Sequence, residues 1–195
     1  MTLVNDVAAR ASDYDGVLNW GVGIKVEKAL VRAPWHIIDE HEVVWLIADH
    51  STQRQLCTML EGIADDLPNL PPQDAIDFVE QELSAYSQRH YTLEAKFFGR
   101  LANNSKSPTS EQIVKVIAQN HAIDAIHADD LAVELQRLSG ASRACEPGQL
   151  AYMLRCFFDG CRRAIAFEEL ALLKLGGNRL TPAARQAVLR SLQAG

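Results

Sequence analysis

The chain contains Tyr86-Ser-Gln-Arg-His90-Tyr-Thr-Leu-Glu94-Ala-Lys-Phe97-Phe98, in which a histidine and a glutamate stand four residues apart within an apolar pattern. On a helix this spacing places both side chains on one face, one turn apart. If that face is buried, an imidazole and a carboxylate there must be hydrogen-bonded, ion-paired or bound to a metal to offset their desolvation. The segment therefore predicts a polar site in a helical core, to which other parts of the chain contribute.

The composition favours one soluble domain. The 195 residues are 48% hydrophobic and 23% charged, enough for a single substantial core. A net charge of −6 gives no basic surface, so we expect neither nucleic acid nor membrane as a partner. The chain shows no signal-peptide pattern and no apolar run long enough to cross a bilayer, and its four cysteines lack zinc-finger or CxxC spacing. These features together predict a cytoplasmic protein.

Apolar residues recur at helical spacing in four long segments, each ended by proline, glycine or a polar break. The segments run from about 39 to 67, 74 to 102, 109 to 140 and 147 to 175. Because the breaks between them are short and no strand-like alternation occurs, we predict an all-α fold, an antiparallel up-down-up-down four-helix bundle.

Two further parts flank the bundle, which we place at residues 40–176. Residues 1–39 form an N-terminal arm whose tryptophans, Trp20 and Trp35, are expected to pack on the bundle. Residues 177–195 contain a short amphipathic helix, with threonine at the N-cap and proline at the first helical position in Thr181-Pro182.

Each long helix carries a candidate metal ligand in the middle of its apolar stripe. With a rise of about 1.5 Å per residue, all of them fall roughly 15 to 18 Å from the same end of the bundle. Imidazole and carboxylate ligands suit iron, manganese and zinc. We therefore predict one metal site from the five residues His50, His90, Glu94, His121 and Glu168.

Two patterns of metal-binding bundle compete. The ferritin-like pattern requires Glu-x-x-His on two helices, and only Asp124-x-x-His127 comes near it. The chain instead resembles the hemerythrin family, in its bacterial form often called the HHE cation-binding domain. The resemblance covers residues 40–176 and rests on Asp49-His50, Arg89-His90-Tyr-Thr-Leu-Glu94-Ala-Lys-Phe-Phe98, Asn120-His121 and Ala164-Ile-Ala-Phe-Glu168-Glu169.

This resemblance implies a carboxylate-bridged di-iron centre that binds oxygen, or senses oxygen, nitric oxide or iron. His50 and His90 match the terminal histidines of one iron, and Glu94 and Glu168 match the bridging carboxylates. His121 matches the first of three histidines on the other iron.

The remaining two histidines are replaced by Ala125 and Ala164, so the resemblance implies a mononuclear or asymmetric site for one or two non-haem iron ions, with manganese or zinc also fitting. Asp124 could swing toward the gap, whereas His127 faces elsewhere on its helix. Cys161 could offer a thiolate or be a small buried residue.

Three functions are compatible with these residues. The first is a hemerythrin-like iron protein in oxygen, nitric oxide or iron sensing, storage or stress response, with a small diatomic molecule as ligand. The second is a metal-free interaction or regulatory module that has lost the di-iron site and binds a protein partner. An enzyme using the metal for oxygen chemistry ranks last, because no independent catalytic group is recognisable. No catalytic residue is therefore predicted.

Overall fold

The computed structural model describes residues 38–103, 107–139 and 146–194, and within these ranges the side chains of residues 87–93 lie outside the description. The predicted N-terminal arm falls almost entirely outside the described residues, so its packing stays a prediction. All regular secondary structure in the described ranges is helical, which confirms the all-α prediction. The elements are α1 (Glu40–Asp66), α2 (Gln73–Asn103), α3 (Pro108–Ser139), α4 (Pro147–Gly176), the 3₁₀ turn η1 (Gly177–Arg179) and α5 (Pro182–Ala194).

The helix ends agree with the predicted ones to within one or two residues, and local chemistry explains three of them. Asp39 caps α1, because its side chain accepts a hydrogen bond from the backbone N–H of His41 at 2.9 Å. Thr181 caps α5 through the N–H of Ala184 at 3.2 Å. Gly177 ends α4 with a φ of +50°, a conformation that a side chain would strain.

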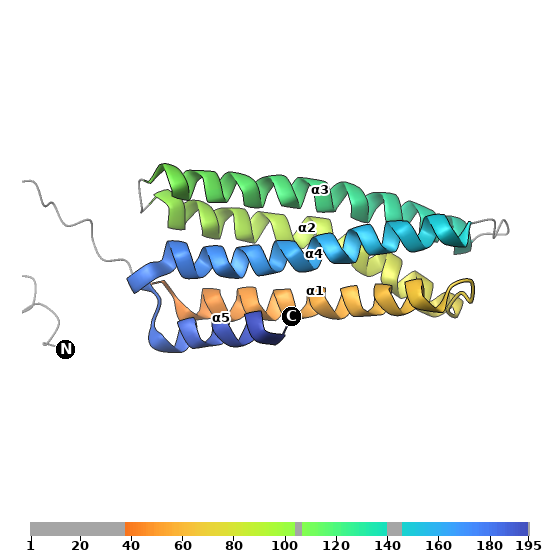
Figure 1. The fold of residues 1–195 in the computed structure, drawn as a ribbon, viewed down its shortest axis with the longest axis horizontal. Coiled ribbons are helices and arrows are strands. Elements are labelled where there is room, and N and C mark those ends of the chain that lie inside the picture. Colours follow the sequence, from red (N-terminus) through yellow and green to blue (C-terminus); the bar gives the residue numbers. More distant parts are fainter. Residues whose placement is uncertain (1–37, 104–106, 140–145, 195) are drawn as a thin grey trace, which may run out of the picture. The chain divides into compact units, whose positions relative to one another are not determined.

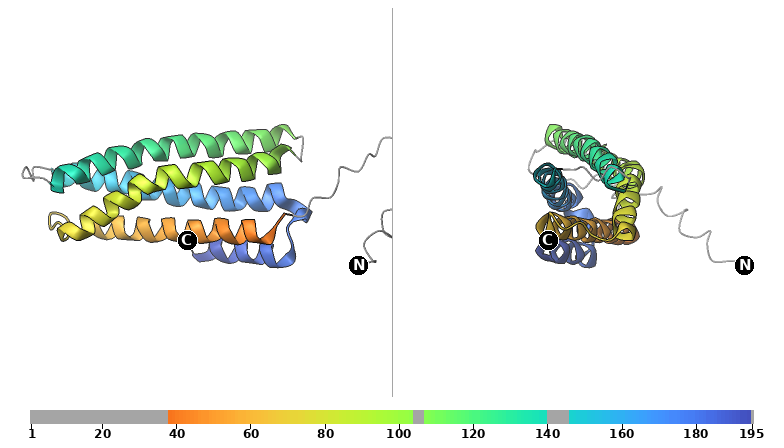
Figure 2. Two further views of the ribbon diagram at one scale, coloured as in Figure 1. Left: turned by 180° about the vertical axis from the view of Figure 1, so that it is seen from behind. Right: turned by 90° about the vertical axis from the view of Figure 1, so that its right-hand side faces the viewer.

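Figures 1 and 2 show the four long helices lying side by side, with α5 beside α1. The colours in Figure 1 run in one direction along α1 and α3 and in the other along α2 and α4. α1 packs on α4 and on α5, α2 packs on α3, and α4 also contacts α3 and α5. Every long helix therefore has a side facing the shared core.

The core consists of two apolar clusters with polar residues between them. One cluster contains the aromatic pair Tyr86 and Phe157, whose rings meet edge to face with centroids 5.5 Å apart. The other contains Phe98 together with Leu46 and Leu172. Each of the four long helices contributes residues to both clusters. Between these residues each helix carries buried histidine, glutamate, glutamine or aspartate side chains. This polar layer contains the candidate site.

Candidate metal centre

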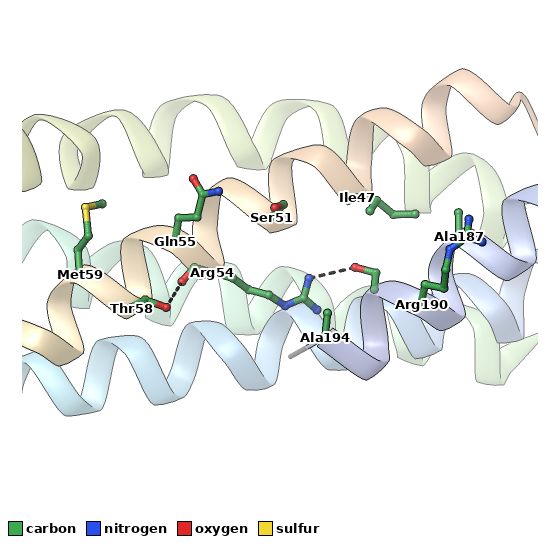
Figure 3. A pocket seen from close by; sticks show the side chains of 10 residues that line it. Ile47, Ser51, Arg54, Gln55, Thr58, Met59, Ala187, Arg190 and Ala194 are labelled. Carbon is green, nitrogen blue, oxygen red and sulfur yellow. Dashed lines mark hydrogen bonds between the residues drawn. The ribbon is translucent and has the colours of Figure 1, made fainter.

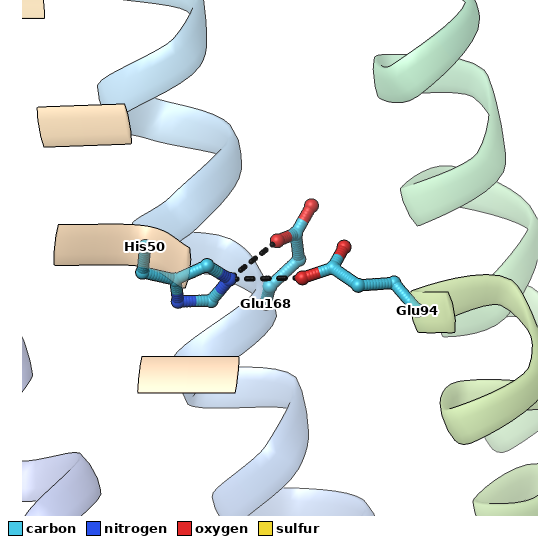
Figure 4. Close-up of side chains that lie close together, drawn as sticks. All are labelled: His50, Glu94 and Glu168. Carbon is cyan, nitrogen blue, oxygen red and sulfur yellow. Dashed lines mark hydrogen bonds and ion pairs between the residues drawn. The ribbon is translucent and has the colours of Figure 1, made fainter. Parts of the chain in front are cut away.

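Four buried side chains, one from each long helix, meet in the polar layer. His50 comes from α1, Glu94 from α2, His121 from α3 and Glu168 from α4, and their exposed fractions are 0%, 0%, 5% and 1%. Figure 4 shows three of them, with the imidazole pointing at both carboxylates. Ligand atoms of these three, His50, Glu94 and Glu168, lie within 4.8 Å of one another, a spacing that one metal ion could bridge.

The two carboxylates connect the two histidines symmetrically. The Nε2 atom of His50 lies 3.0 Å from Oε1 of Glu94 and 3.1 Å from Oε2 of Glu168. The Nε2 atom of His121 lies 3.1 Å from the other oxygen of Glu94 and 2.6 Å from the other oxygen of Glu168. Each carboxylate thus turns one oxygen to each imidazole, and two ring nitrogens and four carboxylate oxygens converge on one buried space.

A third carboxylate holds the far side of the His50 ring. Oε1 of Glu169 lies 2.9 Å from Nδ1 of His50. Glu169 is fully buried and also accepts hydrogen bonds from the guanidinium of Arg54, at 3.1 Å to each oxygen, and from the hydroxyl of Ser191, at 2.7 Å. Sequence reasoning missed Arg54 and Ser191. The only signal for Glu169 was its position directly after Glu168.

The pKa values of the two histidines are raised by this arrangement. Burial favours the neutral ring and lowers the pKa, but hydrogen bonds with Glu168 and Glu94 outweigh it and raise the pKa of His121 to about 9. Burial also lowers the pKa of His50, but hydrogen bonds with Glu168, Glu169 and Glu94 outweigh this effect and raise the pKa well above 6.5. Both imidazoles are therefore charged near neutral pH, each between carboxylates.

The pKa of Glu169 moves the other way. Burial alone would raise it, but hydrogen bonds from His50, Arg54 and Ser191 lower it below its ordinary value. Glu169 is thus an ionised carboxylate in a fully buried position, and its charge is matched by the guanidinium of Arg54.

The fifth predicted ligand, His90, cannot be placed among the others. Its backbone belongs to α2, one turn before Glu94, but its side chain lies outside the described residues. Its role as a ligand therefore stays a prediction.

A cavity of about 410 Å³ between α3 and α4 lies next to the predicted gap in the ligand set. Ala164, Asp124 and His127 all line it, but none of the four residues that meet in the polar layer does, so the orientation of His127 away from the ligands stays a prediction. Asp124 is buried, and its Oδ1 lies 3.1 Å from the point where a Cβ on Gly160 would stand. The small residue Ala164 thus leaves room in this cavity, whereas the carboxylate of Asp124 already occupies the space next to Gly160.

Cys161 lies in the apolar cluster of Tyr86 and Phe157, beside the polar layer. Its sulfur accepts a hydrogen bond from the hydroxyl of Tyr86 at 3.6 Å and lies 3.8 Å from Oε1 of Gln53. A hydrogen bond with Cys57, followed by burial, raises the pKa of Cys161 well above 9. A thiol of this kind stays protonated at neutral pH, which favours the small buried residue over the thiolate ligand.

The helices and the buried histidine and carboxylate groups define a class of protein, a helical protein with a core suited to binding metal cations. The profile of the Hemerythrin HHE cation binding domain matches residues 41–175, and the chain belongs to this family. Comparison with curated proteins and with solved structures gives no match. In the ranges that the structure describes, none of the helices combines the length and apolarity needed to cross a membrane.

Proposed function

We propose that the chain is a cytoplasmic, antiparallel up-down-up-down four-helix bundle of the hemerythrin type that holds non-haem iron in its polar layer. Its role would be oxygen, nitric oxide or iron sensing, storage or stress response, with a diatomic molecule as ligand. The observation that carries the proposal is the alternating arrangement of His50, Glu94, His121 and Glu168, in which every ligand atom faces the same buried space.

The donor set fits the proposed metal. Imidazole nitrogens and carboxylate oxygens are ligands that iron accepts, and manganese and zinc share this preference. His50, Glu94 and Glu168 would hold the first ion, together with His90 as the predicted fourth ligand. Iron bound there would supply binding of small diatomic molecules and one-electron chemistry.

The two halves of the site differ in nitrogen ligands, which supports a mononuclear or asymmetric centre. Both carboxylates offer one oxygen to each half. On the His121 side the two further family positions are Ala125 and Ala164, neither of which can ligate. A second ion would therefore be held by His121 and the two bridging carboxylates, with fewer protein ligands than the first.

The chain itself performs three tasks in this function. It keeps the site dry, because the apolar clusters lie on both sides of the layer. It orients the His50 ring through Glu169. It also holds protons on the ring nitrogens until a cation replaces them, since the pKa of each histidine is raised.

Metal analysis of protein purified under low oxygen, with an absorption spectrum, tests the proposal. We expect about one tightly bound iron per chain, consistent with the single complete half-site. His50→Ala should remove it and His121→Ala should weaken it, whereas His41→Ala, an exposed histidine at the start of the same helix α1, should leave it unchanged. Two tightly bound irons with the spectrum of an oxo-bridged pair would refute the mononuclear preference.

One observation favours a second candidate, a metal-free interaction or regulatory module. Glu94 and Glu168 already pair with both His50 and His121, so these groups satisfy one another through hydrogen bonds and charge. If wild-type protein binds iron, manganese and zinc only weakly, and His50→Ala does not change the small amount found, this second candidate replaces the first.

A further inference from the structure

Glu169 connects three helices at the edge of the polar layer. It lies on α4, accepts from Nδ1 of His50 and from Arg54 on α1, and accepts from the hydroxyl of Ser191 on α5. The guanidinium of Arg54 also donates to the Ser191 hydroxyl at 3.0 Å, so the three side chains form a closed set of hydrogen bonds. Ser191 belongs to a helix that begins after residue 175, where the match to the hemerythrin family ends.

This set of hydrogen bonds controls the orientation of the imidazole. A histidine that donates its Nδ1–H to a carboxylate must present Nε2 on the opposite side of the ring. In this protein Nε2 of His50 then faces Glu94 and Glu168. A carboxylate partner also makes the imidazole a better electron donor, and such partners typically change metal affinity by about 10- to 100-fold.

Arg54 and Ser191 are what make a charged Glu169 tolerable in the core. An ionised carboxylate that is fully buried needs a matching charge and several donors. Arg54 supplies two donors and the charge, and Ser191 supplies one donor. Without Ser191 the carboxylate could rotate toward Arg54 and loosen its bond to His50.

α5 reaches this set along a groove that it shares with α1. The groove encloses about 740 Å³ and is lined by Arg54, Ser191 and residues of both helices. Figure 3 shows Arg54 extending from α1 along this space toward α5. The contact is therefore made by α5 in its packed position, and it depends on that helix staying against α1.

We infer that Glu169, Arg54 and Ser191 are positioning residues for the metal ligand His50, and that the C-terminal helix α5 is a working part of the metal centre. This inference rests on the proposed metal-binding function. In this arrangement α5 contributes the hydroxyl of Ser191, which donates to Glu169, the carboxylate that orients the ligand His50.

Binding of Zn²⁺ to the full chain, measured by competition with a chromophoric chelator, tests the inference. Glu169→Leu should weaken binding about 10- to 100-fold, and Ser191→Ala should weaken it by a smaller factor in the same direction. Ser191→Thr, which keeps the hydroxyl, should restore wild-type affinity. Ser51→Ala is the matched control, because this exposed serine lines the same groove on α1.

A second measurement separates positioning from folding. Nitrogen-15 NMR of the His50 ring reports which nitrogen carries the proton and whether that proton is protected from exchange. In wild-type protein loaded with Zn²⁺ we expect a protected proton on Nδ1 and metal on Nε2. Glu169→Leu should lose this protection while circular dichroism shows unchanged helix content.

The outcomes for this inference and for the proposed function are distinct. If wild-type protein binds no metal but the Nδ1 proton of His50 is protected and becomes unprotected in Ser191→Ala, the metal function fails and the positioning role stands. If metal binds tightly while Ser191→Ala and Glu169→Leu change neither affinity nor the ring signals, the positioning role is overturned. Metal on Nδ1 of His50 would also overturn it.

Discussion

Loading the site with a divalent cation should displace protons from His50 and His121. The pKa of His121 is about 9 and that of His50 lies well above 6.5, so both rings carry a proton on Nε2 at pH 7. A metal ion needs the lone pair of that same nitrogen. Uptake therefore exchanges a cation for a proton at each histidine that becomes a ligand.

The magnitude follows from the pKa of His121. At pH 7 the ring lies about 2 pH units below its pKa, and at about 1.36 kcal/mol per unit its deprotonation costs about 2.7 kcal/mol. Apparent affinity should rise about tenfold per pH unit for each displaced proton, and about a hundredfold where both histidines ligate. For His121 the dependence should flatten as pH passes 9, where the ring is already neutral.

Isothermal titration of Zn²⁺ in two buffers of different ionisation enthalpy counts the released protons directly. At pH 7 we expect a count between one and two per chain, depending on whether one histidine ligates or both. His121→Gln should reduce the count only if His121 is a ligand, and His41→Gln is the control because this histidine is exposed at the start of α1, nine residues before His50. A count of zero, with affinity independent of pH between 6.5 and 9, would refute the assignment of the raised pKa values and of Nε2 as the ligand atom.

Three further predictions concern stability and the incomplete half of the site. The free energy of unfolding of metal-free protein, measured with urea from pH 6 to 10, should include about 3 kcal/mol from the raised pKa of His121, present in full below pH 6.5 and lost as pH rises through about 9. His121→Gln should abolish that part of the pH dependence, and a flat wild-type profile would contradict it. Ala164→His should add a ligand beside the 410 Å³ cavity and tighten binding of a second cation in the same titration, whereas Ala164→Leu should not. Gly177→Ala should lower stability by about 1–3 kcal/mol in thermal unfolding because φ is +50° there, whereas Gly148→Ala, with open space around its Cβ, should not.

The sequence was sufficient to predict the helices and four of the residues in the polar layer. Apolar spacing predicts each helix and its ends, since tertiary packing here agrees with local preference. Rise per residue predicts that His50, His90, His121 and Glu168 share a level, with Glu94 one turn from His90. The structure brings His50, Glu94, His121 and Glu168 together. His90 falls outside the described side chains, so the fifth ligand stays untested.

The support around His50 could not be predicted in the same way. Glu169 lies one residue, about 100° of helix rotation, from the Glu168 stripe, so periodicity alone places it away from the core. It is buried because α1 and α5 both pack against that side of α4, and the position of α5 does not follow from its own amphipathic pattern. Arg54 likewise resembles an ordinary surface residue in sequence, because its role depends on Glu169 and Ser191 being nearby.

Charge balance in the layer gives a physical reason for an asymmetric centre. With both histidines protonated, the imidazoles of His50 and His121 and the guanidinium of Arg54 match the carboxylates of Glu94, Glu168 and Glu169, so these six groups together carry no net charge. Replacing one proton by a divalent cation leaves one excess positive charge, and replacing both leaves two. Excess charge is costly among side chains that are so well shielded from water, because little solvent screens it. The second cation therefore needs an additional anion. The His121 half of the site has a single histidine, so it is the half least able to hold a cation without that anion.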